Sequence, residues 1–471
     1  MDATALSRAI AAADAEHGTA RRELEALVRV PSISADPAHH ADVARSAELT
    51  AELMRAHGLE SVRIAGVDGS MPFVIGEWMH AGADAPTVLL YAHHDVQPPG
   101  IVANWRSDPF EPTERDGRLY GRGTADDKAG AVAHIHAVGA WLRSNGAAPC
   151  NVRVLVEGEE EIGSPMLHPF LTAHLDELRA DVLVLADSSN WAVGVPGITC
   201  SLRGLAAADI ELRALDGPQH SGLVGGAVPD PVMALARVLA SLVDEHGDPA
   251  FAGARDGLSP PTAQEAAPIA GFDDAPHEFA ATIGVRPGVR LTGDPATTLH
   301  ERLWRRPTIT VIGIDGHPIE GSSNQIVARA AARVSLRVGP GQDPDRVVAA
   351  LRAHVEAAVP WGLECTFTPR EAVPAWSTDS DGPAFDAAMR ALERGFGVPA
   401  VRMGMGGSIP FVGPFADAFG GIPALLMGPE DPGSCIHGEN ESLHLADWAA
   451  LVRSEVALLA ELGDLAGRRG A

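Results

Sequence analysis

Cysteine is scarce in this chain of 471 residues, and its spacing excludes two structural classes. The four cysteines are Cys150, Cys200, Cys365 and Cys435, and no two of them form a CxxC pair. Such a pattern indicates neither a zinc knuckle nor a disulfide framework. We therefore expect a reducing compartment and a cytoplasmic protein.

Positive charge and long hydrophobic runs are also lacking. Lysine and arginine number 36 against 62 acidic residues, and the formal net charge of -26 disfavours binding to nucleic acid or to an anionic membrane. The chain has no stretch of about 18 uncharged apolar residues, and its first residues lack an apolar core flanked by basic residues. The sequence predicts no nucleic-acid partner, no membrane span and no secretion signal.

The remaining composition is that of a globular protein. Hydrophobic residues make up 46% of the chain and charged residues 21%, which disfavours disorder and fibrous repeats. A chain of this length is expected to form two or three folding units.

Three near-continuous apolar runs predict strands that are buried on both faces of an α/β sheet. These runs are TVLLYA at 87–92, VRVLVE at 152–157 and DVLVLA at 181–186. Amphipathic patterns predict helices at about 4–29 and 40–57. A further helix, expected from Asp126 to about Gly146, connects the first two strands.

The pattern changes between residues 205 and 369. There the order strand, helix, strand, strand, helix, strand indicates a ferredoxin-like fold, with a Pro- and Gly-rich insertion at about 248–306 to which we assign no role. After residue 378 the sequence predicts a helix, a buried strand and a terminal helix, which again fit the α/β pattern of the first region. We predict an α/β domain with a mixed, mainly parallel sheet, formed by residues 1–201 and 378–471 and interrupted by a smaller ferredoxin-like α+β domain at 202–377.

Possible metal ligands follow each of the apolar runs. In open α/β sheets the carboxyl ends of the strands border one crevice, where ligands bind. The candidates are His93 and Asp95, Glu159 to Glu161, Asp187, the pair Asp126 and Asp127 at a helix start, and His437 after the late strand. Singly, each has an ordinary alternative: a hydrogen-bonded histidine, a helix cap or a solvated acidic loop. Their joint occurrence at one sheet edge favours a metal site.

The types of ligand limit the choice of metal and of chemistry. Imidazole and carboxylate ligands without thiolate suit zinc, manganese or cobalt, and they suit neither a structural cysteine site nor an all-oxygen calcium site. Two ions that share a carboxylate polarise a carbonyl group and lower the pKa of a shared water. A nearby carboxylate that is not a ligand then accepts the proton of that water.

Seven segments together resemble a known family. They are YAHHDVQPPG, LYGRGTADDKAG, EGEEEIGS, VLADSSN, DGPQHSG, GGSIP and CIHGENE. In this order they are similar to the signature segments of the dinuclear-metal peptidases that include carnosinase-like dipeptidases, glutamate carboxypeptidases, aminoacylases and acetylornithine or succinyl-diaminopimelate deacylases. The resemblance covers about residues 5–460 and is strongest to the dipeptidase branch.

The resemblance implies a role for each ligand candidate. One ion is assigned to His93, Asp126 and Asp187, and the other to Asp126, Glu161 and His437, so that Asp126 bridges them. Glu160 becomes the general base, and Asp95 orients His93 through its second ring nitrogen. The peptide bond between Asp126 and Asp127 is expected to be cis, and zinc is the preferred metal, with manganese or cobalt as alternatives.

The inserted domain is expected to act as a lid and a dimerisation domain. In dimeric relatives the histidine that matches His220 reaches the site of the second subunit and stabilises the oxyanion; its alternative is a turn histidine. Arg337 and Asn324 match residues that hold the terminal carboxylate and the carbonyl group of the substrate, and Arg337 has the alternative of an ordinary surface arginine. The matching segment on the other side comprises Gly406, Gly407 and Ser408.

A few residues depart from the family pattern or are expected not to bind metal. Met405 stands where many dipeptidases have Glu, Val327 replaces a Pro, and Ala92 replaces a Gly. Of these, Met405 bears on substrate preference, because it removes a charge. We expect that His94 is not a ligand, since neighbouring strand residues point to opposite faces, and that Cys435 is a packed thiol.

The predicted function is hydrolysis of the amide bond of dipeptides or similar small peptide-like substrates. A hydroxide shared by the two ions attacks the carbonyl group, with Glu160 as general base, and the enzyme is expected to be a homodimer. The main alternative is an N-acyl-amino-acid deacylase that uses the same site. A non-catalytic binding protein with this fold is a more distant alternative, which the joint presence of Glu160, Asp95 and all five ligands disfavours.

Overall fold

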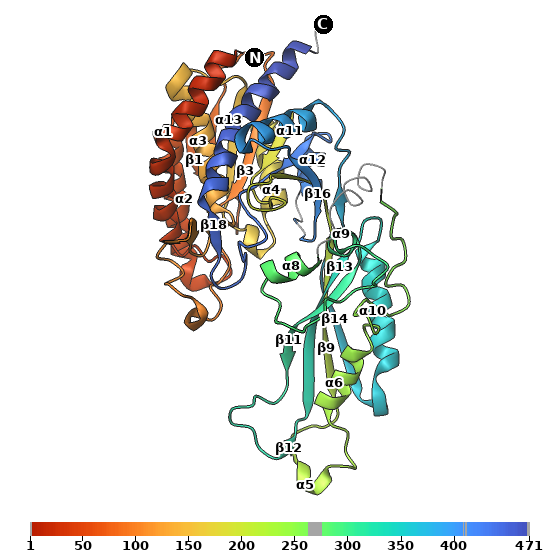
Figure 1. Ribbon diagram of the computed structural model, residues 1–471. Helices are drawn as coiled ribbons and strands as arrows, with labels where there is room; N and C mark the ends of the chain where they lie inside the picture. The colour runs from red at the N-terminus through yellow and green to blue at the C-terminus, as the bar shows by residue number, and fades with distance from the viewer. Residues whose placement is uncertain (1, 262–275, 408, 410–411, 469–471) are drawn as a thin grey trace. The chain divides into compact units, whose positions relative to one another are not determined.

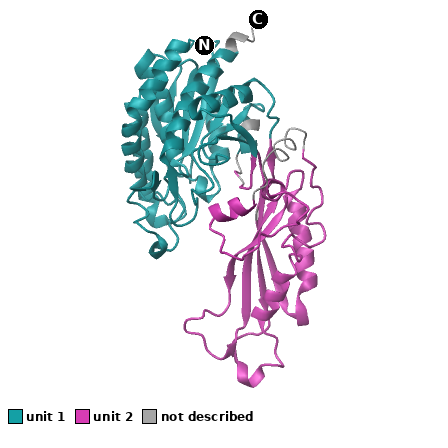
Figure 2. Ribbon diagram, in the orientation of Figure 1, with its two compact units in different colours: residues 1–200, 378–403, 410–471 teal, residues 201–377, 404–409 magenta. Residues whose placement is uncertain are grey.

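The chain forms two compact units in a computed structural model that describes residues 2–261, 276–407, 409 and 412–468 (Figure 1). Unit 1 comprises residues 1–200, 378–403 and 410–471, and unit 2 comprises residues 201–377 and 404–409 (Figure 2). The short segment 404–409, which we placed in the α/β domain by its position in the sequence, groups with unit 2.

Unit 1 is built on a mixed sheet whose central strands are parallel. The strand order is β1 (Glu60–Ala65), β2 (Phe73–Trp78), β6 (Asn151–Glu157), β3 (Thr87–His93), β7 (Val182–Leu185), β17 (Ala424–Leu426) and β8 (Gly197–Leu202). The pairs β6–β3, β3–β7 and β7–β17 are parallel, whereas β1, β2 and β8 pair antiparallel. The three predicted apolar strands are adjacent in this sheet. Their side chains are buried on both faces, which confirms the prediction from their apolar sequences.

Helices cover this sheet, and most of them share one apolar core with it. They are α1 (Ala3–Val28), α2 (His40–Ala56), α3 (Lys128–Asn145), α4 (Leu167–Leu178), α11 (Pro383–Phe396), α12 (Val412–Ala418) and α13 (Leu445–Arg468). Helix α3 packs against both α1 and α13. It begins at Lys128, two residues later than predicted, and it ends at Gly146, whose left-handed φ of 72° closes the last turn. A small sheet of β4 (Thr113–Arg115), β5 (Arg118–Tyr120) and β18 (Ser442–His444) completes the unit.

Unit 2 has the predicted ferredoxin-like topology. Its elements in chain order are β9 (Gly204–Arg213), α6 (Pro231–Ala240), β11 (Thr308–Asp315), β13 (Arg329–Val338), α10 (Pro344–Ala358) and β14 (Glu364–Val373), and the antiparallel sheet has the order β11-β13-β9-β14. Burial alternates along β9 from residue to residue, as expected for a sheet with one covered and one open face. The covered face packs its apolar side chains together with those of α6 and α10.

Short elements complete the description. They are β10 (Gln219–His220), α5 (Ser221–Val224), α8 (Pro276–Thr282), α9 (Leu299–Trp304), β12 (Gln325–Ile326), β15 (Trp376–Ser377) and β16 (Val401–Met405). Part of the insertion at 248–306, residues 262–275, lies outside the described residues. Within the described ranges, no helix combines the length and the apolar composition needed to cross a membrane.

Candidate metal centre

The ligand candidates lie at the carboxyl edge of the unit 1 sheet. His93 is the last residue of β3, Asp187 follows the end of β7, and Glu161 lies in a short helical turn after β6. Because β6, β3 and β7 are adjacent and parallel, their ends bring these side chains to one edge. Asp126 comes from the turn before α3, and His437 from the turn between β17 and β18.

Two overlapping groups of ligand atoms result. His93, Asp126 and Asp187 form one group and Asp126, Glu161 and His437 the other, and within each group the ligand atoms lie within 4.8 Å of one another. Asp126 directs one oxygen to each group: Oδ1 lies 3.0 Å from His93 Nε2, and Oδ2 lies 3.0 Å from His437 Nε2. His437 Nε2 also lies 3.2 Å from Glu161 Oε2. The structure therefore brings together all five predicted ligands in the two predicted sets.

The charges of these groups fit divalent cations. Burial and, to a smaller extent, the nearby Asp126 carboxylate together raise the pKa of Asp187 to about 7. Burial also raises the pKa of Glu160 well above its usual value and the pKa of Glu161 to a lesser degree. Several carboxylates thus converge where burial opposes their ionisation, and divalent cations supply the positive charge that would let them ionise.

Asp95 connects His93 to the acidic turn. Its Oδ1 lies 3.4 Å from His93 Nδ1, and its carboxylate accepts the backbone N–H groups of Glu160 at 3.2 Å and Glu161 at 3.1 Å. The side chain of Asp95 is fully buried. It is therefore placed to orient the imidazole of His93 and to fix the turn that carries Glu160. The peptide bond between Asp126 and Asp127 is cis, as the resemblance implied.

The two residues that we expected not to bind metal lie outside both groups, but one prediction about them is wrong. His94 Nε2 lies 3.0 Å from the carbonyl oxygen of Pro72, and burial lowers the pKa of His94 to about 4. Cys435 is exposed and not a packed thiol. Its backbone adopts a left-handed conformation, with φ of 53°, within the turn that precedes His437. The sequence pattern did not reveal this turn.

Two further side chains support the centre and were missed in the sequence. Gln97 donates from its backbone N–H to Glu161 Oε1 at 3.1 Å and from Nε2 to Glu161 Oε2 at 2.9 Å. The buried Glu430 accepts a hydrogen bond of 2.7 Å from Ser189, which follows Asp187 in the chain. Gln97 lies inside the segment YAHHDVQPPG, and Glu430 lies a few residues before CIHGENE, so their closeness in the sequence to ligand candidates was the available signal.

The unit 2 candidates occupy two separate places. His220 pairs with Gln325 in the β10–β12 ribbon, and Ser221 N–H donates to the carbonyl oxygen of Asn324 at 2.9 Å, so His220 and Asn324 are neighbours. Both are exposed. Arg337 lies toward the far end of β13, and at about 3.3 Å per residue it is roughly 26 Å from Arg329 at the near end. Arg337 and Asn324 of one chain therefore do not form a single subsite.

Arg337 has a charged neighbour that we did not predict. Burial and the charge of Arg337 together lower the pKa of Arg203 to about 10, and burial also lowers the pKa of Arg337. Arg203 Nε donates to the carbonyl oxygen of Gly406 at 3.1 Å. The guanidinium group of Arg203 beside Gly406, together with the charge of Arg337 that acts on it, makes this part of unit 2 attractive to a carboxylate. Ser408 lies outside the described residues.

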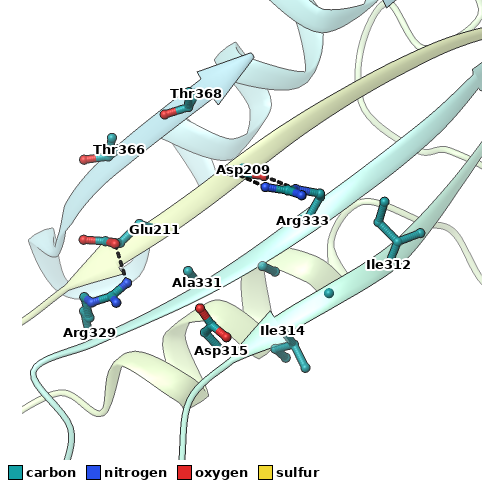
Figure 3. Close-up of a pocket in the computed structure, with 12 residues that line it drawn as sticks. Asp209, Glu211, Ile312, Ile314, Asp315, Arg329, Ala331, Arg333, Thr366 and Thr368 are labelled. Carbon is teal, nitrogen blue, oxygen red and sulfur yellow. Dashed lines mark hydrogen bonds and ion pairs between the residues drawn. The ribbon is translucent and has the colours of Figure 1, made fainter. Parts of the chain in front are cut away.

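A hollow on the open face of the unit 2 sheet does not resemble a reaction site (Figure 3). Its charged residues pair with one another: Arg333 Nε donates to Asp209 Oδ1 at 2.6 Å, and Arg329 Nη1 donates to Glu211 Oε2 at 2.7 Å. Hydrogen bonds from Arg333 and Arg370 lower the pKa of Asp209. The lowered pKa keeps Asp209 ionised and paired with arginine, which is the arrangement of a structural ion pair.

A third group of histidine and carboxylate side chains lies in unit 1, between α1, α2 and α3. Glu23 Oε2 lies 3.1 Å from His57 Nε2 and 2.5 Å from His136 Nε2. Arg143 Nη1 lies 2.7 Å from His57 Nδ1. A guanidinium group only donates, so His57 Nδ1 accepts and its proton sits on Nε2, directed at Glu23. The ligand atoms of this cluster, which we call the helix cluster, are thus occupied by their own hydrogen bonds.

The fold and the two overlapping groups of ligand atoms are those of a metal-dependent hydrolase. The model of peptidase family M20/M25/M40 matches residues 89–461, and the chain belongs to this family of metallopeptidases.

Relatives in this family include proteins named as dipeptidases. The cysteinylglycine-S-conjugate dipeptidase of Corynebacterium striatum is 33% identical over 447 residues, covering 94% of this chain and 95% of that protein. The β-Ala-His dipeptidase of Rattus norvegicus is 30% identical over 389 residues, covering 81% and 78%. The crystal structure of human carnosine dipeptidase 1 superposes with a TM-score of 0.88 at 25% identity, covering 98% of this chain and 99% of that one. The family and the fold predicted from the sequence are confirmed.

Proposed function

We propose that the protein is a dipeptidase that uses two divalent ions, preferably zinc, to hydrolyse the amide bond of small peptides. The observation that supports this most strongly is the sharing of Asp126 between two groups of ligand atoms, with His93 on one oxygen and His437 on the other. Relatives named as dipeptidases along most of the chain support the same substrate class. They do not favour the alternative of an N-acyl-amino-acid deacylase.

Each residue of the centre has a distinct task in this proposal. When bound, the two ions would polarise the scissile carbonyl group and lower the pKa of a water. Glu160 takes the proton of that water and later returns it to the leaving amine, since it lies beside the ligands and the resemblance makes it the general base. Asp95 holds the imidazole of His93 and the backbone of Glu160 in place.

The substrate is held by unit 2 residues from two chains in this proposal. Arg337 and the Gly406–Gly407 backbone would bind the terminal carboxylate. His220 and Asn324, which are neighbours at the other end of β13, would reach the centre of a second subunit, where His220 stabilises the oxyanion. Supporting a homodimer, the edge strand β11 exposes Ile312 and Ile314 at 59% and 64%, and exposed apolar edges favour association.

The dimer has a direct test. Light scattering on the full-length protein is expected to give twice the chain mass, and Ile312→Lys together with Ile314→Lys is expected to shift the protein toward the monomer and to lower kcat. His220→Ala is expected to lower kcat without dissociating the dimer. A fully active monomer would exclude the contribution of a second subunit.

Comparing free dipeptides with their N-acetylated forms tests the substrate class. Metal-stripped enzyme reconstituted with zinc, manganese or cobalt is expected to cleave the free dipeptides faster, with zinc the preferred ion. Faster cleavage of the acetylated forms would favour the deacylase. Substituting Met405→Glu in the same assay is expected to change KM more than kcat, because the change adds a charge at the proposed substrate site.

We also propose a cytoplasmic location. All four cysteines are free thiols, which suits a reducing compartment. Cell fractionation tests this proposal, and recovery of the protein outside the cytoplasm would contradict it.

A further inference from the structure

A buried ion pair beside the metal centre joins Arg122 to Glu441. Arg122 Nη1 donates to Glu441 Oε2 at 2.6 Å, and the exposed fractions of the two side chains are 1% and 0%. No step of the proposed reaction uses either residue. Burying two charges is unfavourable unless further hydrogen bonds compensate, so the remaining contacts of the pair show what it holds.

Glu441 binds the backbone of the segment that carries Asp126. Its Oε1 accepts the N–H groups of Ala125 at 2.9 Å and of Asp126 itself at 3.2 Å, and its Oε2 accepts the N–H group of Gly123 at 3.1 Å. Glu441 also lies in the segment CIHGENE, shortly after His437. One carboxylate thus connects the backbone of the bridging ligand to the loop of another ligand.

Arg122 adds a second contact to the His437 loop and extends the connection to one further segment. Its Nη2 donates to the carbonyl oxygen of Gly438 at 3.0 Å and to that of Pro98 at 3.2 Å. Gly438 follows His437 directly, and Pro98 belongs to the segment that follows Asp95. The planar guanidinium fork therefore holds together three segments that carry residues of the centre.

The loop that carries His437 needs such support. His437 and Asn440 both adopt left-handed backbone conformations, with φ of 59° and 63°. This region is unfavourable for residues other than glycine and persists where the surroundings impose it. Arg122 binds the carbonyl oxygen of Gly438, which lies between these two residues, and Glu441 directly follows Asn440. Together with the hydrogen bonds of the Asn440 side chain to Arg106 N–H and to the carbonyl oxygen of Asn104, these contacts can impose the conformation.

We propose that Arg122 and Glu441 are positioning residues for the group formed by Asp126, Glu161 and His437. By fixing the Asp126 backbone relative to the His437 loop, the pair sets the affinity of this group for its ion, whereas the group that contains Asp187 depends on it less. This inference rests on the proposed two-ion function.

The substitution Glu441→Gln tests the proposal with little change of shape. The amide oxygen still accepts hydrogen bonds on one side, but the amide NH2 group then faces donors from Arg122 and Gly123. Arg122→Lys is the second variant, because lysine keeps the charge but lacks the fork that reaches Glu441, Gly438 and Pro98 together. The matched control is Glu455→Gln, another buried carboxylate of unit 1, which lies 2.9 Å from His134 Nδ1.

The experiment titrates metal-stripped, full-length enzyme with Co²⁺ and follows the visible absorption of the bound ion. The wild type is expected to bind two equivalents. In Glu441→Gln the second equivalent is expected to bind about 10–100-fold more weakly, with the first nearly unchanged. Excess Co²⁺ should restore kcat, with KM for the dipeptide unaltered. Glu455→Gln is expected to lose thermal stability while keeping the wild-type titration.

The outcomes separate this inference from the proposed function. A wild type that binds fewer than two equivalents contradicts the two-ion function itself. Two equivalents bound with wild-type affinity by Glu441→Gln, or by Arg122→Lys if the first variant does not fold, overturn the positioning role alone. Equal weakening in Glu455→Gln would also overturn it, because the effect would then reflect general stability.

Discussion

The metal centre and the helix cluster are built from the same residue types, and only one of them is suited to metal. The centre gathers Asp126, Glu160, Glu161 and Asp187 around two imidazoles, and burial raises the pKa of three of these carboxyl groups. The helix cluster has one carboxylate, Glu23, beside its two imidazoles, and the guanidinium group of Arg143 contacts one of them, that of His57. The difference teaches that unbalanced negative charge, rather than proximity of histidine and carboxylate, marks a cation site.

The largest effect is expected from Asp126→Asn. Both groups of the centre lose their shared carboxylate, so metal binding and dipeptide hydrolysis should both disappear, as they should in wild type treated with a chelator. Atomic emission on dialysed protein and a dipeptide assay measure the two properties. The control Asp42→Asn changes an acid that pairs with His39 at the surface and should keep both properties. Retained activity without bound metal would contradict the metal-dependent reaction.

Glu160→Gln is expected to lower kcat by about 10²–10⁴-fold while two ions stay bound. The amide cannot accept the proton of the attacking water, but the ligands are unchanged. Single-turnover kinetics together with metal analysis separate the two properties. The control is the neighbouring variant Glu159→Gln, because the Glu159 carboxylate accepts hydrogen bonds from the backbone N–H groups of Met71 and Met166. The kcat of this variant should remain close to that of the wild type. Near-normal turnover in Glu160→Gln would rule out its role as base.

Glu23→Gln is expected to affect stability and leave the reaction unchanged. Burial opposes ionisation of Glu23, but hydrogen bonds from His136 and His57 outweigh it and lower its pKa to about 2. The ionised carboxylate therefore stabilises the fold above pH about 4.5, and this contribution is lost as the pH falls from there toward 2. At pH 7 urea unfolding should show a loss of about 1.5–3 kcal/mol.

The pH dependence sharpens this prediction. The difference in the free energy of unfolding between wild type and Glu23→Gln should shrink as the pH is lowered from 5 toward 3, because Glu23 becomes protonated in the unfolded wild type first. Glu25→Gln serves as the control, since Glu25 forms an i,i+4 pair with Arg21 on the same helix. A difference that grows toward acid pH would mean that the helix cluster is not held by an ionised Glu23.

The smallest effect on the enzyme is expected from Arg143→Met. Stability should fall by about 1 kcal/mol, and kcat should not change. The loss of the guanidinium group allows the proton of His57 to move to Nδ1, which frees Nε2 as a ligand beside Glu23 and His136. Zinc titration should then detect an additional weak equivalent. Arg45→Met, at an exposed pair with Glu48, is the control and should bind no additional zinc.

The sequence could predict the residues of the centre that follow strands, because the ends of neighbouring parallel strands meet at one edge. His93 and Asp187 are of this kind. The pairing of Asp126 with His437 came from the family resemblance, since these residues meet only when distant segments close on each other. The helix cluster was not foreseen, because its members lie on three helices whose facing sides depend on packing. The separation of Asn324 from Arg337 depends on the bounds of β13, which begins at Arg329 and extends past Arg337.

The number of zinc ions bound per chain tests the central claim most directly. Stripped protein, reconstituted with excess zinc, dialysed and analysed for metal, is expected to hold two ions per chain, and Glu23→Gln should hold the same two. A third ion that disappears in Glu23→Gln would contradict the account, because the helix cluster would then bind metal despite Arg143.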